Sequence, residues 1–158
     1  MSAIINTAVT PGQALPDLVG KLLSARQKSL VLYQKLATLK PLAQSAPMQS
    51  HLLQRFQDAL MDYLALGPFQ VFQALEDQPT NSPYRRAREL GRQLYARIAR
   101  TTQTALAFYD RYHGDLSRKD LATLSKDLSR LGEQLAVRIE LEDQIVAAVR
   151  QSERPIPA

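Results

Sequence analysis

Residues 117–149, SRKDLATLSKDLSRLGEQLAVRIELEDQIVAAV, hold the pattern that decides the fold. Their first half places leucines alternately three and four positions apart, at Leu121, Leu124, Leu128, Leu131 and Leu135. This spacing is typical of the buried seam of a helix in a bundle. Ser117 and Asp120 resemble a capping box, in which each residue satisfies a free backbone N–H of the first turn. The stretch therefore predicts a long helix that ends near Arg150.

The same seam continues past the leucines with two charged residues. Counting on by three and four gives Arg138, Glu142, Ile145 and Val149. Arg138 and Glu142 are four residues apart and can touch. Because a buried unpaired charge costs several kcal/mol, we expect the two to pair or to reach water. Two interpretations stay open: a polar layer or solvent-open seam end that fixes helix register, or a polar groove that recognises a partner.

Proline and glycine divide the rest of the chain into further helices. No period-2 alternation, hairpin signal or internal repeat occurs, so every long segment is predicted to be helical. Gly67 is expected to end the second helix in the left-handed conformation, and Pro68 to open a short third one. Ser82 is expected to cap the fourth. The expected helices cover residues 16–39, 47–66, 68–76, 83–112 and 117–150.

These segments predict an all-α, up-down antiparallel four-helix bundle with an extra short helix after Gly67. Residues 1–15 are expected to be a flexible arm, 16–150 a single domain and 151–158 a frayed tail. The fourth helix carries its own predicted seam, at Ala87, Gly91, Leu94, Ile98, Thr101, Ala105, Phe108 and Tyr112.

Polar residues also fall on the predicted core faces of the first two helices. Arg26, Ser29 and Tyr33 share one face of the first helix with Leu22 and Leu36, and join Arg138 and Glu142 in a candidate interior polar cluster. On the second helix, Asp62 lies at the edge of the face formed by Leu52, Phe56, Leu60 and Tyr63.

Composition argues against catalysis. The 158 residues include no cysteine and two histidines, which leaves little for nucleophilic catalysis or for a metal centre. A di-iron bundle needs two Glu-x-x-His motifs, and this chain offers one half-match, Asp110-x-x-His113. No phosphate-loop, dinucleotide or nucleophile-elbow motif occurs. We expect no enzyme activity, cofactor or metal. Without a signal peptide or membrane span, a soluble cytoplasmic protein is expected.

The positive charge is concentrated in one helix. Residues 84–100 hold six arginines and one glutamate, which matches the net charge of +5 of the whole chain. We name Arg85, Arg88, Arg92, Arg97 and Arg100 the arginine face. Three interpretations stay open: a solvated helix surface, a site for an acidic protein partner, or a nucleic-acid site.

Several segments resemble one bacterial family. LMDYLALGPFQVF, residues 60–72, is similar to the signature L-V-D-Y-x-S-x-G-H-F-x-x-Y of the Rsd/AlgQ anti-sigma factors. Residues 18–36, 105–115 and 131–146 resemble other parts of that family in the right order. Pro68 stands where the family has histidine, Ala65 replaces a small polar residue, and Gly20-Lys21-Leu22 replaces Asp-Arg-Trp.

The resemblance implies a function and a set of contacts. Family members form an all-α bundle that binds region 4 of the primary sigma factor and keeps it from core RNA polymerase and the promoter. Some also bind a phosphotransferase carrier protein or affect a (p)ppGpp hydrolase. By position, Asp62 matches an aspartate at the sigma contact. The expected partner-binding residues are Asp62, Tyr63, Leu66, Phe69 and Phe72.

Overall fold

A computed structural model describes residues 11–39 and 46–153, and all the regular structure in these ranges is helical. The two longest helices are α4 and α5, which follow each other in the chain. The elements in order are α1 (Pro11–Ala37), α2 (Ala46–Leu66), the π-helical segment η3 (Gly67–Val71), α3 (Phe72–Glu76), α4 (Arg85–Tyr112) and α5 (Arg118–Ser152).

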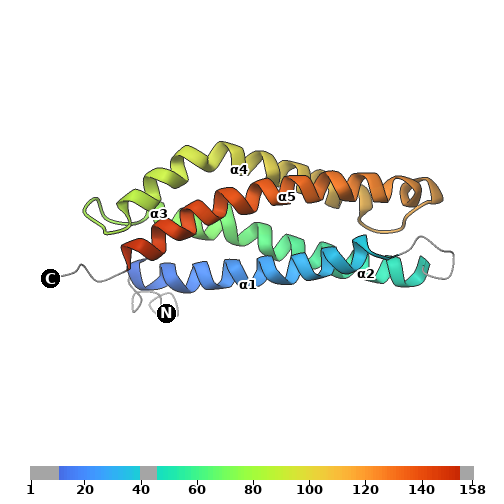
Figure 1. Cartoon of the computed structure of the whole chain (residues 1–158), viewed down its shortest axis with the longest axis horizontal. Coiled ribbons are helices and arrows are strands. Elements are labelled where there is room, and N and C mark those ends of the chain that lie inside the picture. The colour runs from blue at the N-terminus through green and yellow to red at the C-terminus, as the bar shows by residue number, and fades with distance from the viewer. Residues whose placement is uncertain (1–10, 40–45, 154–158) are drawn as a thin grey trace, which may run out of the picture.

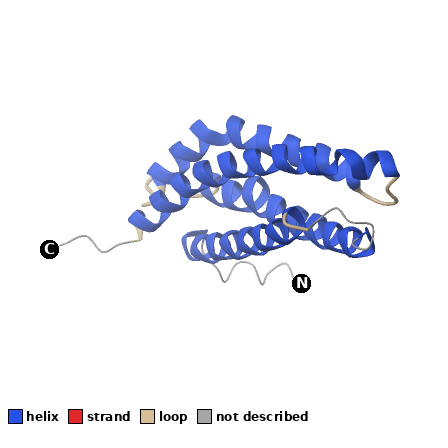
Figure 2. Ribbon diagram, turned by 45° about the vertical axis from the view of Figure 1, so that its right-hand side comes forward, coloured by secondary structure: helices blue, strands red, loops and turns tan. Residues whose placement is uncertain are grey.

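The helices form two antiparallel hairpins that pack on each other (Figure 1). α1 packs against α2, and α4 against α5, while η3 packs on α1 and α2, and α3 contacts both α1 and α4. Along the long axis α1 and α4 run one way, and α2 and α5 run back. The predicted all-α bundle is confirmed, and Figure 2 shows helices and loops alone in the described ranges. No helix in these ranges is long and apolar enough to cross a membrane.

The predicted seams form the core. All eight residues of the α4 seam are buried, and the α5 seam is buried from Leu124 to Val149, Arg138 and Glu142 included. Ring contacts join three helices: Phe56 of α2 lies edge-on to Tyr33 of α1 and to Phe108 of α4. The Ser117–Asp120 capping box is present at the start of α5. Gly114, at φ 85°, makes the turn before it in the left-handed conformation that glycine adopts without strain.

The expected break at Gly67-Pro68 is wrong. Gly67 is not in the left-handed region, since Gly114 is the one described glycine with positive φ. The chain instead stays helical and widens into η3, where the Phe72 N–H donates to the Gly67 carbonyl five residues back. Pro68 has no N–H to donate to residue 64, so a wider turn that shifts the hydrogen-bond register accommodates it. α2, η3 and α3 thus form one continuous helical path, which ends at Glu76 as predicted.

Two helix starts also differ from the prediction. α1 begins at Pro11, so Pro16 lies inside it; Leu15, fully buried, anchors this extra turn to the core. α4 begins at Arg85 with Tyr84 as its N-cap. Ser82 instead closes the preceding loop: its Oγ accepts from the Tyr84 N–H at 3.0 Å and donates to Gln78 Oε1 at 2.8 Å. Residues 1–10 and 154–158 of the predicted arm and tail lie outside the described residues.

Candidate protein-interaction site

Asp62 lies on the solvent-facing side of α2. Its side chain is exposed, and it forms no ion pair with any described residue. Asp58, one turn earlier, is exposed and equally without an ion pair in the described part of the chain. Residues four apart on a helix are neighbours on its surface. The two aspartates therefore present a pair of uncompensated carboxylates on a chain whose net charge is +5.

Tyr63, the next residue, faces the core. It is 1% exposed, so it lies in the interior instead of on the expected contact surface. The physical reason is helical geometry, because successive side chains on a helix point about 100° apart. Its phenol donates a hydrogen bond of 2.5 Å to Glu142 Oε1 on α5. Tyr63 belongs to the interior polar cluster, while its neighbour Asp62 belongs to the surface.

Glu142 is the centre of that cluster and is contacted from three helices. Arg138 Nε donates to Glu142 Oε2 at 2.9 Å, so the predicted pairing within α5 is confirmed. Arg26 of α1 approaches Glu142 Oε1 at 3.4 Å and also pairs with Asp143 at 2.8 Å. Two arginines and two carboxylates balance in charge, which offsets the cost of burial. The arrangement is a polar layer that ties α1, α2 and α5 together, buried at Arg138 and Glu142 and open to solvent at Asp143.

Arg138 extends the layer to α4 and η3. Its Nη1 donates to Thr102 Oγ1 at 2.6 Å and to Thr101 Oγ1 at 3.1 Å. Its guanidinium carbon lies 5.2 Å from the centre of the Tyr63 ring, a cation–π distance. A Cβ added to Gly67 would lie 2.9 Å from Arg138 Nη2. Glycine at position 67 is therefore needed for the close approach of the arginine, and not for a helix cap.

Burial and charge shift two titrating groups of this layer. The pKa of Tyr63 is raised, first by burial and then by the negative charge of Glu142, so the phenol stays a hydrogen-bond donor at neutral pH. Burial acts to lower the pKa of Arg26, but the hydrogen bond and charge of Asp143 outweigh it and the net pKa is raised. Both effects favour the protonation states that the hydrogen bonds require.

Ser29 and Tyr33 lie near this layer but bond elsewhere. Ser29 Oγ is within hydrogen-bond distance of the Ala25 carbonyl, at 3.0 Å, and of the Ala59 carbonyl of α2, at 3.1 Å. The Tyr33 phenol donates to the Leu128 carbonyl of α5 at 2.9 Å, and a Cβ at Gly132 would overlap it. They tie α1 to its two neighbours, and none of these side-chain hydrogen bonds reaches Arg138 or Glu142.

The other expected contact residues differ in exposure. Leu66 is half-buried at the end of α2, near Asp62 in sequence. Phe72 is half-buried and packs edge-on against Tyr95 of α4, with ring centres 5.5 Å apart. The Phe69 side chain lies outside the described part of the structure. Asp62 and Leu66 thus remain together as surface candidates, whereas Phe72 lies against α4.

The arginine face divides into paired and unpaired residues. Arg92 binds Glu76 of α3 through two hydrogen bonds of 2.7 and 2.8 Å, and Arg85 pairs with Glu89 at 3.5 Å. Arg88 donates to the Gln78 carbonyl at 2.7 Å. Arg97 and Arg100 are exposed and form no ion pair within the described ranges. An acidic partner or nucleic acid for this face stays a prediction.

Sequence reasoning missed some participants in the site. Asp58 lies four residues before Asp62, and residues with that spacing are neighbours on a helix surface. The spacing alone could therefore have predicted that the two aspartates lie together. Thr101 is a predicted seam residue whose hydroxyl turns out to accept from Arg138. Asp143 is 54% exposed and pairs with Arg26, a contact between α5 and α1 that no spacing within one helix indicates. No group of three or more potential metal ligands gathers in the part of the chain that the structure describes.

Comparison with known proteins gives the family. Residues 5–150 match the family described as "Regulator of RNA polymerase sigma(70) subunit, Rsd/AlgQ". The chain belongs to the Rsd/AlgQ family. It is 29% identical over 140 residues to the "Regulator of sigma D" of Yersinia pseudotuberculosis, an alignment that covers 86% of this chain and 81% of that protein. The corresponding protein of Sodalis glossinidius is 29% identical over 132 residues, covering 82% of this chain and 86% of its own length.

Family membership confirms the resemblance carried by residues 60–72 and the other matched segments. The family and these relatives are named as sigma-factor regulators, and none of the names describes an enzyme. No solved structure matches the chain. The Rsd/AlgQ match covers α1 to α4 and all but the last two residues of α5, so α2 and the polar layer fall within the family region.

Proposed function

We propose that this protein binds region 4 of the primary sigma factor through the exposed side of α2, and thereby keeps it from core polymerase and the promoter. The observation that carries the proposal is that, of two adjacent residues, one faces solvent and the other faces the core. Asp62 is exposed without an ion pair among the described residues, and Tyr63 is fixed in the core by its bond to Glu142. A carboxylate on a rigid helix surface is preorganised to meet a cationic side chain.

Charge supports this choice of partner. A sigma segment that binds DNA is basic, because it must neutralise phosphates. Asp58 and Asp62 give α2 a local negative surface on an otherwise basic chain. Half-buried Leu66, one turn after Asp62, adds apolar area at the same end of α2. An acidic pair beside apolar surface suits a basic helix with an apolar stripe.

The test is binding of purified protein to sigma region 4 by calorimetry. Asp62→Asn keeps the size of the side chain and removes its charge, and we expect it to weaken binding about tenfold, the loss of one charge-assisted contact. Asp110→Asn is the matched control, an exposed aspartate on α4, and should bind as the unmodified protein does. Equal affinity of the Asp62 variant and the control would remove Asp62 from the interface. Lack of binding by the unmodified protein would overturn the proposed partner.

A further inference from the structure

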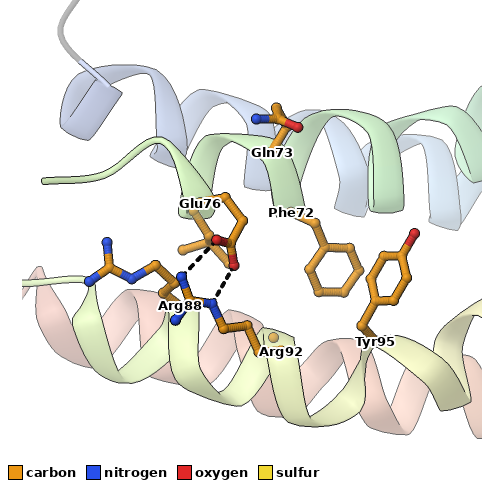
Figure 3. Close-up of a pocket in the computed structure, with 8 residues that line it drawn as sticks. Phe72, Gln73, Glu76, Arg88, Arg92 and Tyr95 are labelled. Carbon is orange, nitrogen blue, oxygen red and sulfur yellow. Dashed lines mark hydrogen bonds and ion pairs between the residues drawn. The ribbon is translucent and has the colours of Figure 1, made fainter. Parts of the chain in front are cut away.

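A pocket whose lining does not include Asp62 lies between α3 and the first half of α4. The pocket measures about 330 Å³, and its lining includes Phe72, Glu76, Arg88, Gly91, Arg92 and Tyr95. Figure 3 shows Phe72 and Tyr95 at one end of it, and Glu76, Arg88 and Arg92 at the other. Its volume lies at the low end of the range for small-ligand sites, about 300–1,000 Å³. One compact group, and not a large cofactor, fits it.

The aromatic end is a formed, partly exposed surface. Phe72 and Tyr95 meet edge-to-face with an interplanar angle of 76°, and Tyr95 is 49% exposed. Gly91 lies beneath Phe72, and a Cβ there would come within 3.1 Å of its ring. The missing side chain lets the Phe72 ring lie close against the α4 backbone. An apolar or aromatic group can therefore pack against two rings already held at a favourable angle.

The other end carries excess positive charge. Arg92 is paired with Glu76, whereas Arg88 forms no ion pair with a described carboxylate and acts on Glu76 through its charge alone. Arg88 is nevertheless fixed in position, since its Nη1 donates to the Gln78 carbonyl at 2.7 Å and to the Pro79 carbonyl at 3.4 Å. Its Nε is buried without a hydrogen-bond partner. Two guanidinium groups and one carboxylate leave this end with one uncompensated positive charge.

Together the two ends restrict the chemistry of a ligand. A purely apolar molecule would form no ion pair with Arg88. An inorganic anion would make no apolar contact with the rings of Phe72 and Tyr95. A cation would be repelled by Arg88 and Arg92. The Glu76–Arg92 pair shows which group fits, because a carboxylate already occupies the guanidinium fork of Arg92 with bidentate geometry.

We propose that this pocket binds a carboxylate that carries an apolar or aromatic group. The carboxylate takes the place of Glu76 on Arg92 and gains the charge of Arg88, while the attached group packs on Phe72 and Tyr95. The exchange replaces one bidentate carboxylate on Arg92 by another, and the Arg92 and Glu76 side chains are 60% and 43% exposed, so the released Glu76 carboxylate returns to water. Such a carboxylate comes either from a small molecule or from an acidic residue beside an aromatic one in a peptide. The proposal does not rest on sigma binding.

The test is an NMR titration of the full chain that follows the amide signals of Gly91 and Tyr95. Phenylacetate is the probe, and phenylacetamide, which has the same ring without the charge, is the matched ligand. We expect phenylacetate to shift these signals saturably and to bind at least fivefold more tightly than the amide. Equal binding of the two, or shifts spread evenly over the surface, would overturn the proposal.

Three variants separate the proposed contact from general charge effects. Glu76→Gln removes the competing carboxylate and should tighten phenylacetate binding about three- to fivefold, a gain within the range of one exposed ion pair. Arg92→Gln should weaken it by a similar factor. Arg130→Gln, an exposed arginine of α5 without an ion pair among the described residues, should leave it unchanged. Unchanged or weaker binding by Glu76→Gln would contradict the exchange.

A capped tripeptide with an aspartate between two phenylalanines identifies the source of the carboxylate. Binding at least tenfold tighter than phenylacetate, with the same response to Glu76→Gln, would assign the pocket to an acidic–aromatic peptide segment. Equal affinity would assign it to a small carboxylate. Failure of both probes to shift Gly91 and Tyr95 would overturn the proposal while leaving the sigma interaction untouched.

Discussion

The phenol of Tyr63 donates a hydrogen bond of 2.5 Å to Glu142, joining α2 to a carboxylate that lies 79 residues further along the chain. Glu142 is 4% exposed and also accepts from Arg138 at 2.9 Å. Arg26 of α1 is a third donor, at 3.4 Å, so the buried carboxylate depends on donors from three helices. The same bond fixes the rotation of α2 about its axis, because it holds Tyr63 inward and so turns Asp62 outward.

Removing the phenol tests this bond directly. We expect Tyr63→Phe to lower the free energy of unfolding by about 2 kcal/mol, the range for a hydrogen bond to a charged group. Urea denaturation followed by circular dichroism measures the change. Tyr95→Phe is the control, because the Tyr95 side chain is exposed and its hydroxyl makes no hydrogen bond to the described residues. A loss for Tyr63→Phe no larger than for Tyr95→Phe would show that Glu142 does not need this donor.

Alkaline pH provides a second measurement on Tyr63. Its pKa is raised in the folded protein, chiefly by burial and then by Glu142. Above the usual tyrosine pKa of about 10, the unfolded chain releases a proton that the folded protein retains, so stability falls as pH rises. Each such group contributes a slope of up to about 1.4 kcal/mol per pH unit. Between pH 9 and 11 the unfolding free energy of Tyr63→Phe should therefore fall less steeply than that of the unmodified protein.

For Gly67→Ala, helix propensity predicts a gain in stability, whereas packing predicts a loss. Alanine is favoured over glycine inside a helix by about 0.5–1 kcal/mol. At position 67 its Cβ would lie 2.9 Å from Arg138 Nη2, inside a hydrogen-bonded layer with little room to move. We expect Gly67→Ala to destabilise the protein by about 1–3 kcal/mol, as overpacking does.

The matched control for Gly67 is another helical glycine. A Cβ at Gly20 of α1 would meet nothing within 4 Å. Gly20→Ala should therefore stabilise the protein by about 0.5–1 kcal/mol. Thermal or urea unfolding of the two variants gives both values. If both variants gained stability alike, Arg138 would have freedom to move away, and the close contact would carry no structural constraint.

Much of the fold follows from periodic patterns in the sequence. The α4 and α5 seams were predicted because apolar spacing of three and four maps directly onto one helix face, and all eight α4 residues are buried. The Arg138–Glu142 pair was predictable because both residues fall on that seam one turn apart. The same rule placed Tyr63 with Phe56 and Leu60 on the core face, and the structure follows that pattern.

Other features depend on contacts between distant segments and leave no local signal. The pair Gly67-Pro68 predicts a helix end, because glycine and proline usually stop an α-helix. In the structure the chain instead forms a wider π-helical turn, which accommodates the missing backbone N–H of Pro68. That Gly67 faces Arg138 depends on the packing of α5 against η3. The pocket at Arg88 and Arg92 likewise needs α3 to lie on α4, which no spacing within either helix reveals.

Asp58 gives the sharpest test of the charge argument for sigma binding. It is exposed one turn before Asp62 and makes no ion pair within the described residues, so it strengthens the negative field of α2 without needing a direct contact. We expect Asp58→Asn to slow association with sigma region 4 about two- to fivefold at 0.05 M salt and to change dissociation little, since charges at the edge of an interface act mainly on encounter. Stopped-flow measurements at rising ionic strength follow the effect.

Because the screening length falls from about 10 Å at 0.1 M to about 3 Å at 1 M, the difference from the unmodified protein should vanish at high salt. Asp110→Asn, which removes an equal charge from α4, should associate at the unmodified rate; a slowing as large as that of Asp58→Asn would mean that net charge, and not the α2 pair, steers the encounter.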